Sequence, residues 1–134
     1  MSWKHVTSQR AGRITTITVN RPESLNAFRL GTYEEMADAI RRAGWNKEIG
    51  VIVLTGAGNR AFGVGGDSKN KKWERAGQGT IGVPVEDVHA AIREAPKPVI
   101  AKVRGYAIGG GNVLMHHLRS DHRGGECYFR PGWA

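Results

Sequence analysis

Cysteine is nearly absent from this sequence of 134 residues, because Cys127 is the only one. A single cysteine excludes a disulfide framework and a cysteine-based metal site. Long apolar runs are also missing, since none approaches the roughly 18–20 residues that a membrane-spanning helix needs. The N-terminal stretch MSWKHVTSQR has no apolar core of a signal peptide. We therefore expect a cytoplasmic protein without membrane attachment.

Glycine and basic residues are the abundant types. There are 19 glycines, many of them within residues 56–66 and 105–111, and the net charge is +8. This charge favours a polyanionic partner. Nucleic acid is disfavoured as that partner, because the basic residues are spread along the chain and no nucleic-acid-binding motif is present. The dense run of Lys69, Lys71 and Lys72 fits a solvated loop and a phosphate-binding loop about equally.

Hydrophobic periodicity predicts an N-terminal β-hairpin followed by a helix. Residues 3–8 and 13–19 alternate as strands do, with a turn at Ala11-Gly12 between them. Apolar residues then recur at helical spacing as far as Gly44. Thr32 is the expected N-cap of this helix, with Glu35 at the capping-box position.

The rest of the chain predicts strands alternating with helices. Residues 51–56 and 98–103 are apolar and indicate buried strands, a helix lies between them before Pro96, and another helix begins near Gly110. Such an order is typical of an α/β fold with parallel strands. The glycine-rich loops that follow the two strands should then lie side by side at the carboxyl edge of the sheet.

Two glycine clusters carry the chemistry. Residues 60–67 (RAFGVGGD) and 105–112 (GYAIGGGN) are places where backbone N–H groups can approach a ligand closely. Two N–H donors converging from separate loops form an oxyanion hole. Each cluster taken alone also fits a tight turn between a strand and a helix. Neither spacing fits a phosphate-binding P-loop or a dinucleotide fingerprint.

Three ordered segments resemble the crotonase (enoyl-CoA hydratase/isomerase) superfamily: NRPESLNAF (20–28), VIVLTGAGNRAFGVGGD (51–67) and PKPVIAKVRGYAIGGGN (96–112). The resemblance runs through residues 10–114. It implies an α/β fold of the crotonase (ClpP-like) type, built from repeated β-β-α units and incomplete at the C-terminus. Within the superfamily, the segments are most similar to the branch that holds 2-ketocyclohexanecarboxyl-CoA hydrolase and 1,4-dihydroxy-2-naphthoyl-CoA synthase.

The resemblance implies a set of site residues. The N–H groups of Gly66 and Gly110 would form the oxyanion hole and stabilise a CoA-thioester enolate. Asp67 either anchors its own loop or touches the substrate. The residues that would bind the substrate and its CoA moiety are Leu25, Ala27, Val64, Gly65, Asp67, Ser68, Tyr106, Ala107, Ile108 and Gly109.

The resemblance also implies partners and alternatives. The partner is an acyl-CoA substrate that carries its own coenzyme, so neither a separate cofactor nor a metal is expected, and the full-length family forms trimers or hexamers. A hydratase carries glutamate two residues after the glycine triplet, where this chain has Val113. Simple hydration is therefore disfavoured, and the resemblance of the segment GTIGVPVEDVHAAIREAPKPVIA (79–101) favours a ring-cleaving hydrolase over the synthase. The synthase and a general hydratase/isomerase stay as alternatives. An inactive truncated CoA-binding fragment is the further alternative, so enzymatic activity stays open.

Residues 115–134 depart from the family pattern, and we expect a boundary between residues 1–114 and this tail. Three histidines and Cys127 lie in the tail, but their spacing fits no standard zinc site. One coding of the tail, read a single base later, gives CTICDLTIAAENAIFGQVGP, which resembles the usual continuation of the family. The hypothesis is a frame shift near codon 115.

This hypothesis predicts the coding DNA directly. Sequencing across codon 115 should yield codons that give this peptide in the shifted frame. Codons that cannot encode it in that frame would rule the frame shift out.

Overall fold

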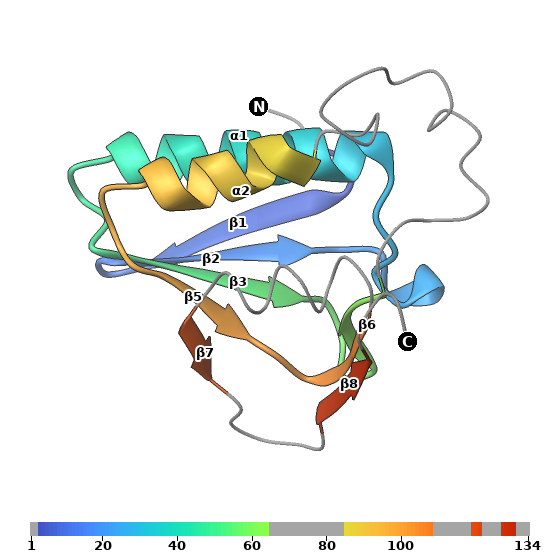
Figure 1. Ribbon diagram of the computed structural model, residues 1–134. Helices are drawn as coiled ribbons and strands as arrows, with labels where there is room; N and C mark the ends of the chain where they lie inside the picture. The colour runs from blue at the N-terminus through green and yellow to red at the C-terminus, as the bar shows by residue number, and fades with distance from the viewer. Residues whose placement is uncertain (1–2, 65–84, 109–118, 122–126, 131–134) are drawn as a thin grey trace.

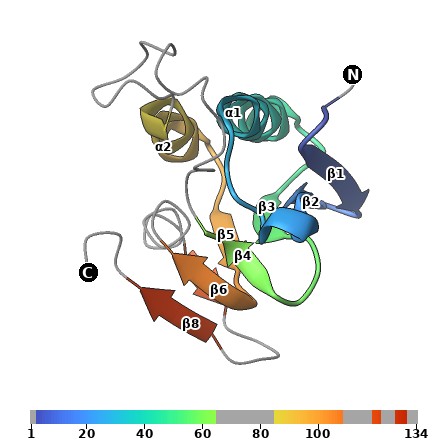
Figure 2. The ribbon, with the colours of Figure 1, turned by 90° about the vertical axis from the view of Figure 1, so that its right-hand side faces the viewer.

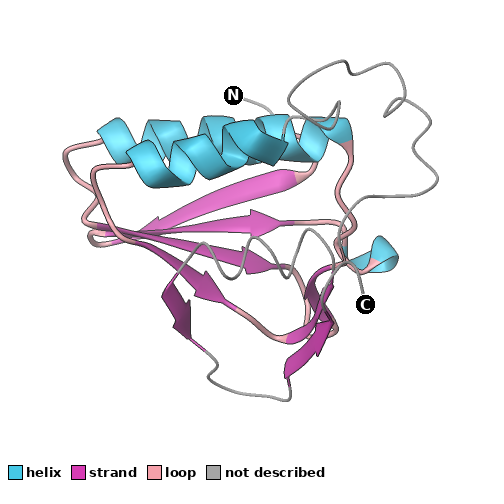
Figure 3. Cartoon of the chain, in the orientation of Figure 1, coloured by secondary structure: helices cyan, strands magenta, loops and turns pink. Residues whose placement is uncertain are grey.

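Two helices cover one face of a five-stranded sheet, and a smaller three-stranded sheet lies beyond the carboxyl ends of its parallel strands, in the computed structural model (Figures 1 and 2). The structure describes residues 3–64, 85–108, 119–121 and 127–130. Figure 3 distinguishes the helices from the strands. The helices are α1 (Leu30–Trp45) and α2 (Val85–Glu94), and a short 3₁₀ turn, η1, spans Pro22–Ser24. The strands are β1 (Val6–Ala11), β2 (Ile14–Val19), β3 (Val51–Gly56), β4 (Ala61–Gly63), β5 (Val99–Lys102), β6 (Gly105–Ile108), β7 (Arg119–Asp121) and β8 (Cys127–Arg130).

The predicted hairpin is confirmed, with shifted bounds. β1 and β2 pair antiparallel, and Ala11 lies opposite Ile14, so the turn consists of Gly12 and Arg13 rather than Ala11 and Gly12. Gly12 has a φ of 60°, a value that glycine adopts without steric cost. The residues just before β1 also form hydrogen bonds to α1.

The parallel order expected from alternating strands and helices is also confirmed. β2 pairs with β3 and β3 pairs with β5, both in parallel. The larger sheet has the order β1-β2-β3-β5-β7, and the smaller has the order β4-β6-β8. The short strands β4, β6, β7 and β8 were not predicted, since β4 and β6 lie in glycine-rich segments and β7 and β8 lie in the tail that departs from the family pattern. The helix expected near Gly110 lies outside the described residues.

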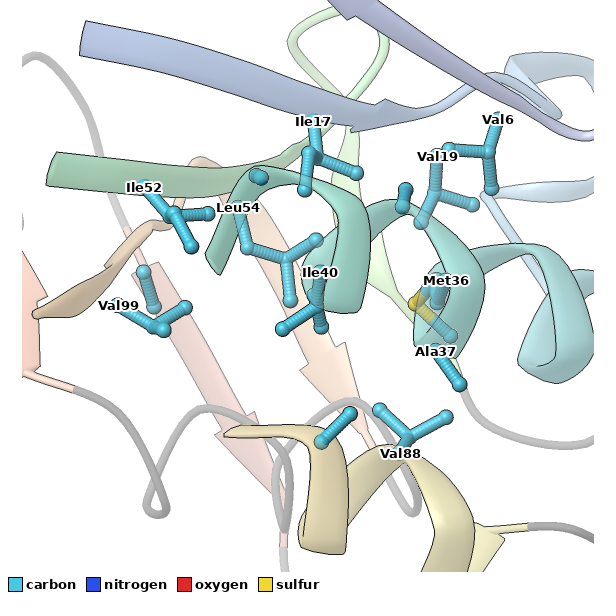
Figure 4. Packing of buried hydrophobic residues seen from close by; sticks show 14 of the residues in the cluster. Val6, Ile17, Val19, Met36, Ala37, Ile40, Ile52, Leu54, Val88 and Val99 are labelled. Carbon is cyan, nitrogen blue, oxygen red and sulfur yellow. The ribbon is translucent and has the colours of Figure 1, made fainter. Parts of the chain in front are cut away.

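The core lies between the larger sheet and the helices. Alternate residues of the parallel strands, such as Ile17, Ile52 and Leu54, are fully buried. They face Met36 and Ile40 of α1, as the close view shows (Figure 4). Burying one such aliphatic side chain contributes about 1.5–3 kcal/mol, so this layer holds α1 in a fixed place. No described helix has the length and apolar character required to cross a bilayer.

The N-terminal end of α1 differs from the prediction that Thr32 caps it. The N-cap is Arg29, whose backbone N–H donates to Thr32 Oγ1 over 3.1 Å. Glu35 does not complete a capping box, because its carboxylate accepts the backbone N–H groups of Lys4 (2.7 Å) and His5 (2.6 Å). A contact between distant residues has thus replaced the local one, which sequence spacing cannot reveal.

Residues 3–5 are fastened to α1 by further hydrogen bonds. The Trp3 indole N–H donates to Asp38 Oδ2 over 3.0 Å. His5 Nδ1 lies 2.9 Å from Thr32 Oγ1. On the other side, Asn20 N–H donates to the His5 carbonyl over 2.7 Å. His5 therefore joins the start of α1 to the end of β2.

The environment of His5 disfavours its charged form. Burial lowers the pKa of His5, opposed by Glu35 and reinforced by the positive charges of Arg21, Arg29 and Lys4. Because the folded protein binds this proton less tightly than the unfolded chain, His5 contributes stability above its ordinary pKa of about 6.5. That contribution is lost as the pH falls from there through the lowered pKa.

We therefore expect the free energy of unfolding to fall between about pH 8 and pH 5, the range in which histidine titrates, and to fall less in His5→Asn. The asparagine oxygen can accept the Thr32 hydroxyl hydrogen bond but does not titrate. Urea unfolding of both proteins at a series of pH values measures the difference. Identical pH slopes would show that His5 is not responsible.

Candidate functional site

β4 and β6 lie next to each other, beyond the carboxyl ends of β3 and β5 (Figures 1 and 2). They pair in parallel, with Ala61 opposite Tyr106 and Gly63 opposite Ala107, and the register shifts between the two pairs. These strands belong to the two glycine-rich segments. The prediction that the segments lie side by side is therefore confirmed for their described residues.

The side chain of Asn26 connects the turn of residues 21–28 to the start of β4. Its Nδ2 donates to the carbonyls of Ala57 (3.0 Å) and Ala61 (2.8 Å). Its Oδ1 accepts the backbone N–H of Arg21 over 2.9 Å. Asn26 is only 1% exposed and has a φ of 55°, in the left-handed region that asparagine tolerates better than most residues. The 21–28 turn and β4 thus share one buried polar side chain.

Two glycines permit close approach of the backbone at this place. A Cβ on Gly105 would lie 2.0 Å from the Arg60 carbonyl oxygen, and the φ of Gly105 is 68°. The N–H of Tyr106 donates to the same oxygen over 3.0 Å. A Cβ on Gly56 would lie 2.5 Å from the Phe62 carbonyl oxygen. Neither position has room for a side chain. Gly105 allows β6 to approach the start of β4, and Gly56 allows the end of β3 to approach β4.

Aromatic packing supports the same region. A Cβ on Gly63 would lie 2.7 Å from Cζ of Phe28, so the Phe28 ring lies directly on the backbone of β4. Phe28 also packs edge-on against Tyr33, with ring centroids 5.2 Å apart. Burial raises the pKa of Tyr33 to about 12, so its hydroxyl is neutral near pH 7. Tyr33 therefore serves as a packing partner here rather than as a base.

The buried side chain of Arg21 forms a hydrogen bond across the 21–28 turn. It is 6% exposed, and its guanidinium Nη1 donates to the Ala27 carbonyl. The Ala27 N–H donates to Ser24 O over 3.0 Å, and the Leu25 N–H donates to Pro22 O over 3.2 Å. The backbone on either side of Asn26 is held in one conformation by these bonds.

Some predicted site residues are described and some are not. Leu25 and Val64 are half-buried, Ala27 and Ala107 are buried, and Tyr106 is 41% exposed. Asn26 brings Leu25 and Ala27 near the start of β4, and strand pairing brings Tyr106 and Ala107 next to it. The backbone of Ile108 is the end of β6. The remaining predicted residues lie outside the described part of the chain: Gly65, Gly66, Asp67, Ser68, Gly109 and Gly110.

Sequence reasoning missed the roles of the residues that assemble this region. Asn26, Gly56 and Gly105 lie within the segments that resemble the family, but their roles come from contacts with distant backbone. A signal was present for Asn26, because asparagine is enriched at positive φ. For metal binding, the described residues contain no cluster of three or more histidine, cysteine, aspartate or glutamate side chains that could hold an ion.

Comparison with known proteins identifies relatives. Residues 9–121 match the family model described as enoyl-CoA hydratase/isomerase. A putative enoyl-CoA hydratase/isomerase from Acinetobacter baumannii is 31% identical, with a TM-score of 0.76, over 87% of this chain and 49% of that one. The expected boundary at residue 114 stays a prediction, since the family match continues to residue 121.

Two further solved structures of enoyl-CoA hydratases and isomerases are also similar to this chain. An enoyl-CoA hydratase/carnithine racemase from Magnetospirillum magneticum is 29% identical (TM-score 0.75; 87% of this chain, 45% of that chain). A monofunctional enoyl-CoA isomerase from M. smegmatis is 27% identical (TM-score 0.74; 95% of this chain, 53% of that chain). The expected crotonase fold is thereby confirmed. The chain spans about half the length of these relatives.

The close approach at Gly105 predicts a large difference between two glycine substitutions. Gly12 and Gly105 both have positive φ, but a Cβ on Gly12 would meet nothing within 4 Å. Gly12→Ala should cost about 1–2 kcal/mol of unfolding free energy, the usual cost of a left-handed non-glycine residue. Gly105→Ala should cost about 1–3 kcal/mol more, because overpacking against the Arg60 carbonyl is added. Urea unfolding measures both, and equal losses would contradict the close approach.

Proposed function

Because the chain belongs to the enoyl-CoA hydratase/isomerase (crotonase) family, we propose that it binds an acyl-CoA thioester and stabilises the enolate formed from it. The proposed donors are the backbone N–H groups of Gly66 and Gly110. The observation that carries the proposal is the parallel pairing of β4 with β6, in which Gly63 lies opposite Ala107. Gly66 and Gly110 each follow these paired residues by three positions. Three residues span at most about 11 Å. Each donor therefore lies within that distance of its own member of this residue pair.

The chemistry needs donors that are in place before charge develops. Removing a proton or breaking a bond at the carbon next to a thioester carbonyl moves electrons onto the carbonyl oxygen. Two backbone N–H groups aimed at that oxygen stabilise the charge without rearranging, and loss of one donor typically costs ~3 kcal/mol. The bonds of Asn26 and the close approach at Gly105 support this role, because they fix the strands that precede Gly66 and Gly110 in the chain.

The CoA moiety is proposed to lie against the backbone of Leu25, Ala27 and Val64. The Ala27 carbonyl already accepts a hydrogen bond from Arg21, so a ligand would use its second lone pair. Tyr106 is partly exposed, which suits a wall of the acyl pocket, whereas Ala107 is fully buried and would contribute through its backbone. The loop of residues 65–68 would complete the CoA site.

For the specific reaction, we favour ring cleavage of a 2-ketocyclohexanecarboxyl-CoA-like substrate. In this reaction water adds to the ring ketone, and the bond between that carbon and the α-carbon then breaks. The electrons of the broken bond form the thioester enolate, which is protonated at carbon. The support is the motif resemblance and Val113 in the place of the hydratase glutamate. Naphthoyl-CoA synthesis and general hydratase/isomerase chemistry use the same donors and are the alternatives within the family.

A second candidate function is binding of acyl-CoA without turnover. Val113 cannot act as an acid or base. The carboxylates of Glu35, Asp38 and Asp87 are engaged in hydrogen bonds within the fold. Glu35 and Asp38 accept N–H groups of residues 3–5, and Asp87 accepts the Arg41 guanidinium. Turnover of an acyl-CoA by the 134-residue chain would exclude this candidate.

The proposal predicts selective binding of a thioester carbonyl. Butyryl-CoA should bind about tenfold more tightly than S-butyl-CoA, the thioether that lacks the carbonyl oxygen. The reason is that two hydrogen bonds, each worth ~0.5–1.5 kcal/mol net, together contribute roughly 1–3 kcal/mol. A tenfold difference in affinity corresponds to about 1.4 kcal/mol. Isothermal titration calorimetry of the unaltered chain with both ligands measures the ratio.

Three outcomes distinguish the alternatives. Equal affinity for the two ligands would contradict an oxyanion hole while leaving a CoA site. Absence of binding to either ligand would contradict the CoA site itself. Salt-sensitive binding of nucleic acid without binding of CoA would instead favour a role for the net charge of +8.

A further inference from the structure

We propose that Asn26 is a positioning residue that sets the spacing between two substrate-binding segments of backbone. One segment is the 21–28 turn, which contains Leu25 and Ala27. The other is β4 together with Val64, the residue that follows it in the chain. The inference rests on the proposed function, because it assigns Asn26 a role in acyl-CoA binding. Asn26 itself touches neither the substrate nor the reacting atoms.

The three hydrogen bonds of the carboxamide fix its orientation. The backbone N–H of Arg21 can only donate, and the carbonyls of Ala57 and Ala61 can only accept. Oδ1 must therefore face Arg21, and both N–H bonds of Nδ2 are used. With 1% of the residue exposed, water cannot replace these partners. Any change that removes the Nδ2 donor leaves two carbonyls without this hydrogen bond.

The three partners belong to two different segments. Arg21 opens the turn, whereas Ala57 and Ala61 flank the connection from β3 to β4. The bond from the Arg21 guanidinium to Ala27 stays inside the turn and cannot set its distance from β4. The Phe28 ring does cross to Gly63, but an apolar contact can slide where paired hydrogen bonds cannot. Asn26 thus supplies a directional link between the segments.

The backbone of the turn is strained where this link is made. Leu25 and Asn26 are consecutive residues with φ values of 53° and 55°. Left-handed conformation is unfavourable for leucine, whose apolar side chain cannot form a local hydrogen bond to offset it. Strained backbone of this kind persists where surrounding contacts over-determine it, and it concentrates at ligand-binding places. The carboxamide of Asn26 is such a contact.

A ligand that spans both segments depends on their spacing. An acyl-CoA would meet the turn with its CoA moiety and the β4–β6 pair with its thioester. When two contact regions are held at a fixed distance, binding at one raises the effective concentration at the other. Loosening the spacing removes that advantage even if each segment keeps its local conformation. Affinity should therefore fall more than stability would account for.

Two substitutions separate this role from simple stabilisation. Asn26→Asp keeps the shape and the acceptor for Arg21 but replaces the Nδ2 donor with oxygen. Asn26→Gly removes the side chain while keeping the left-handed backbone accessible. The control is Val88→Ala in α2, because Val88 is fully buried in the core between the helices and the sheet and has no part in the proposed site. All are made in the 134-residue chain, and unfolding in urea ranks their stabilities.

The first readout is affinity for butyryl-CoA. We expect at least a tenfold increase in Kd for Asn26→Asp and Asn26→Gly, and less than a twofold change for Val88→Ala. If the Asn26 variants bind as tightly as the control, Asn26 is not a positioning residue. If the unaltered chain does not bind butyryl-CoA, the proposed function fails, and this inference fails with it.

The second readout needs no ligand and applies even when one of the two variants does not fold. In Asn26→Asp and Asn26→Gly, hydrogen exchange should accelerate at least tenfold at the backbone amides of Ala57 and Tyr106. These amides donate to Val19 O and Arg60 O, close to the carbonyls that Asn26 binds. The amides of the β1–β2 ladder should keep their rates. Uniform acceleration over all strands, as expected for Val88→Ala, would overturn the local role.

Discussion

A contact between two stretches of backbone, with no side chain between them, brings the two glycine-rich segments together. At Gly105 the chain passes so close to Arg60 that a Cβ would lie 2.0 Å from its carbonyl oxygen. The same oxygen accepts the N–H of Tyr106. Only glycine allows the contact, which lies where β6 begins to pair with β4. The 21–28 turn contacts β4 through Asn26, which donates to the Ala61 carbonyl, and through Phe28, whose ring lies on Gly63.

The layers of the fold contribute to the junction in different ways. The buried aliphatic residues of β2, β3 and β5 fix α1 against the sheet through packing, which is strong but not directional. The hydrogen bonds of Asn26 then place the turn against β4, and these are directional. Stability thus comes mainly from the helix-covered face, and spacing at the site comes from a few polar bonds and glycines.

The periodic elements could be predicted from the sequence, since their signals are local. The hairpin, both helices and strands β3 and β5 follow from apolar spacing that repeats over many residues. β4 and β6 could not be predicted, because each has three or four residues within a glycine-rich segment and is a strand only through its partner. Glu35 shows the same limit, since its sequence position suggested a cap but its carboxylate binds residues 30 positions away. Asn26 also acts through distant carbonyls, so its role required the structure.

Family membership and geometry support one account of the chemistry. The chain belongs to the enoyl-CoA hydratase/isomerase family, and the two glycine-rich segments of the sequence run in parallel through β4 and β6. The central claim is that two backbone N–H groups beyond these strands polarise a thioester carbonyl. Infrared spectroscopy of butyryl-CoA labelled with ¹³C at that carbonyl tests the claim most directly. The account predicts that the carbonyl stretch of the bound ligand lies at lower frequency than in water, and an unchanged or higher frequency would contradict it.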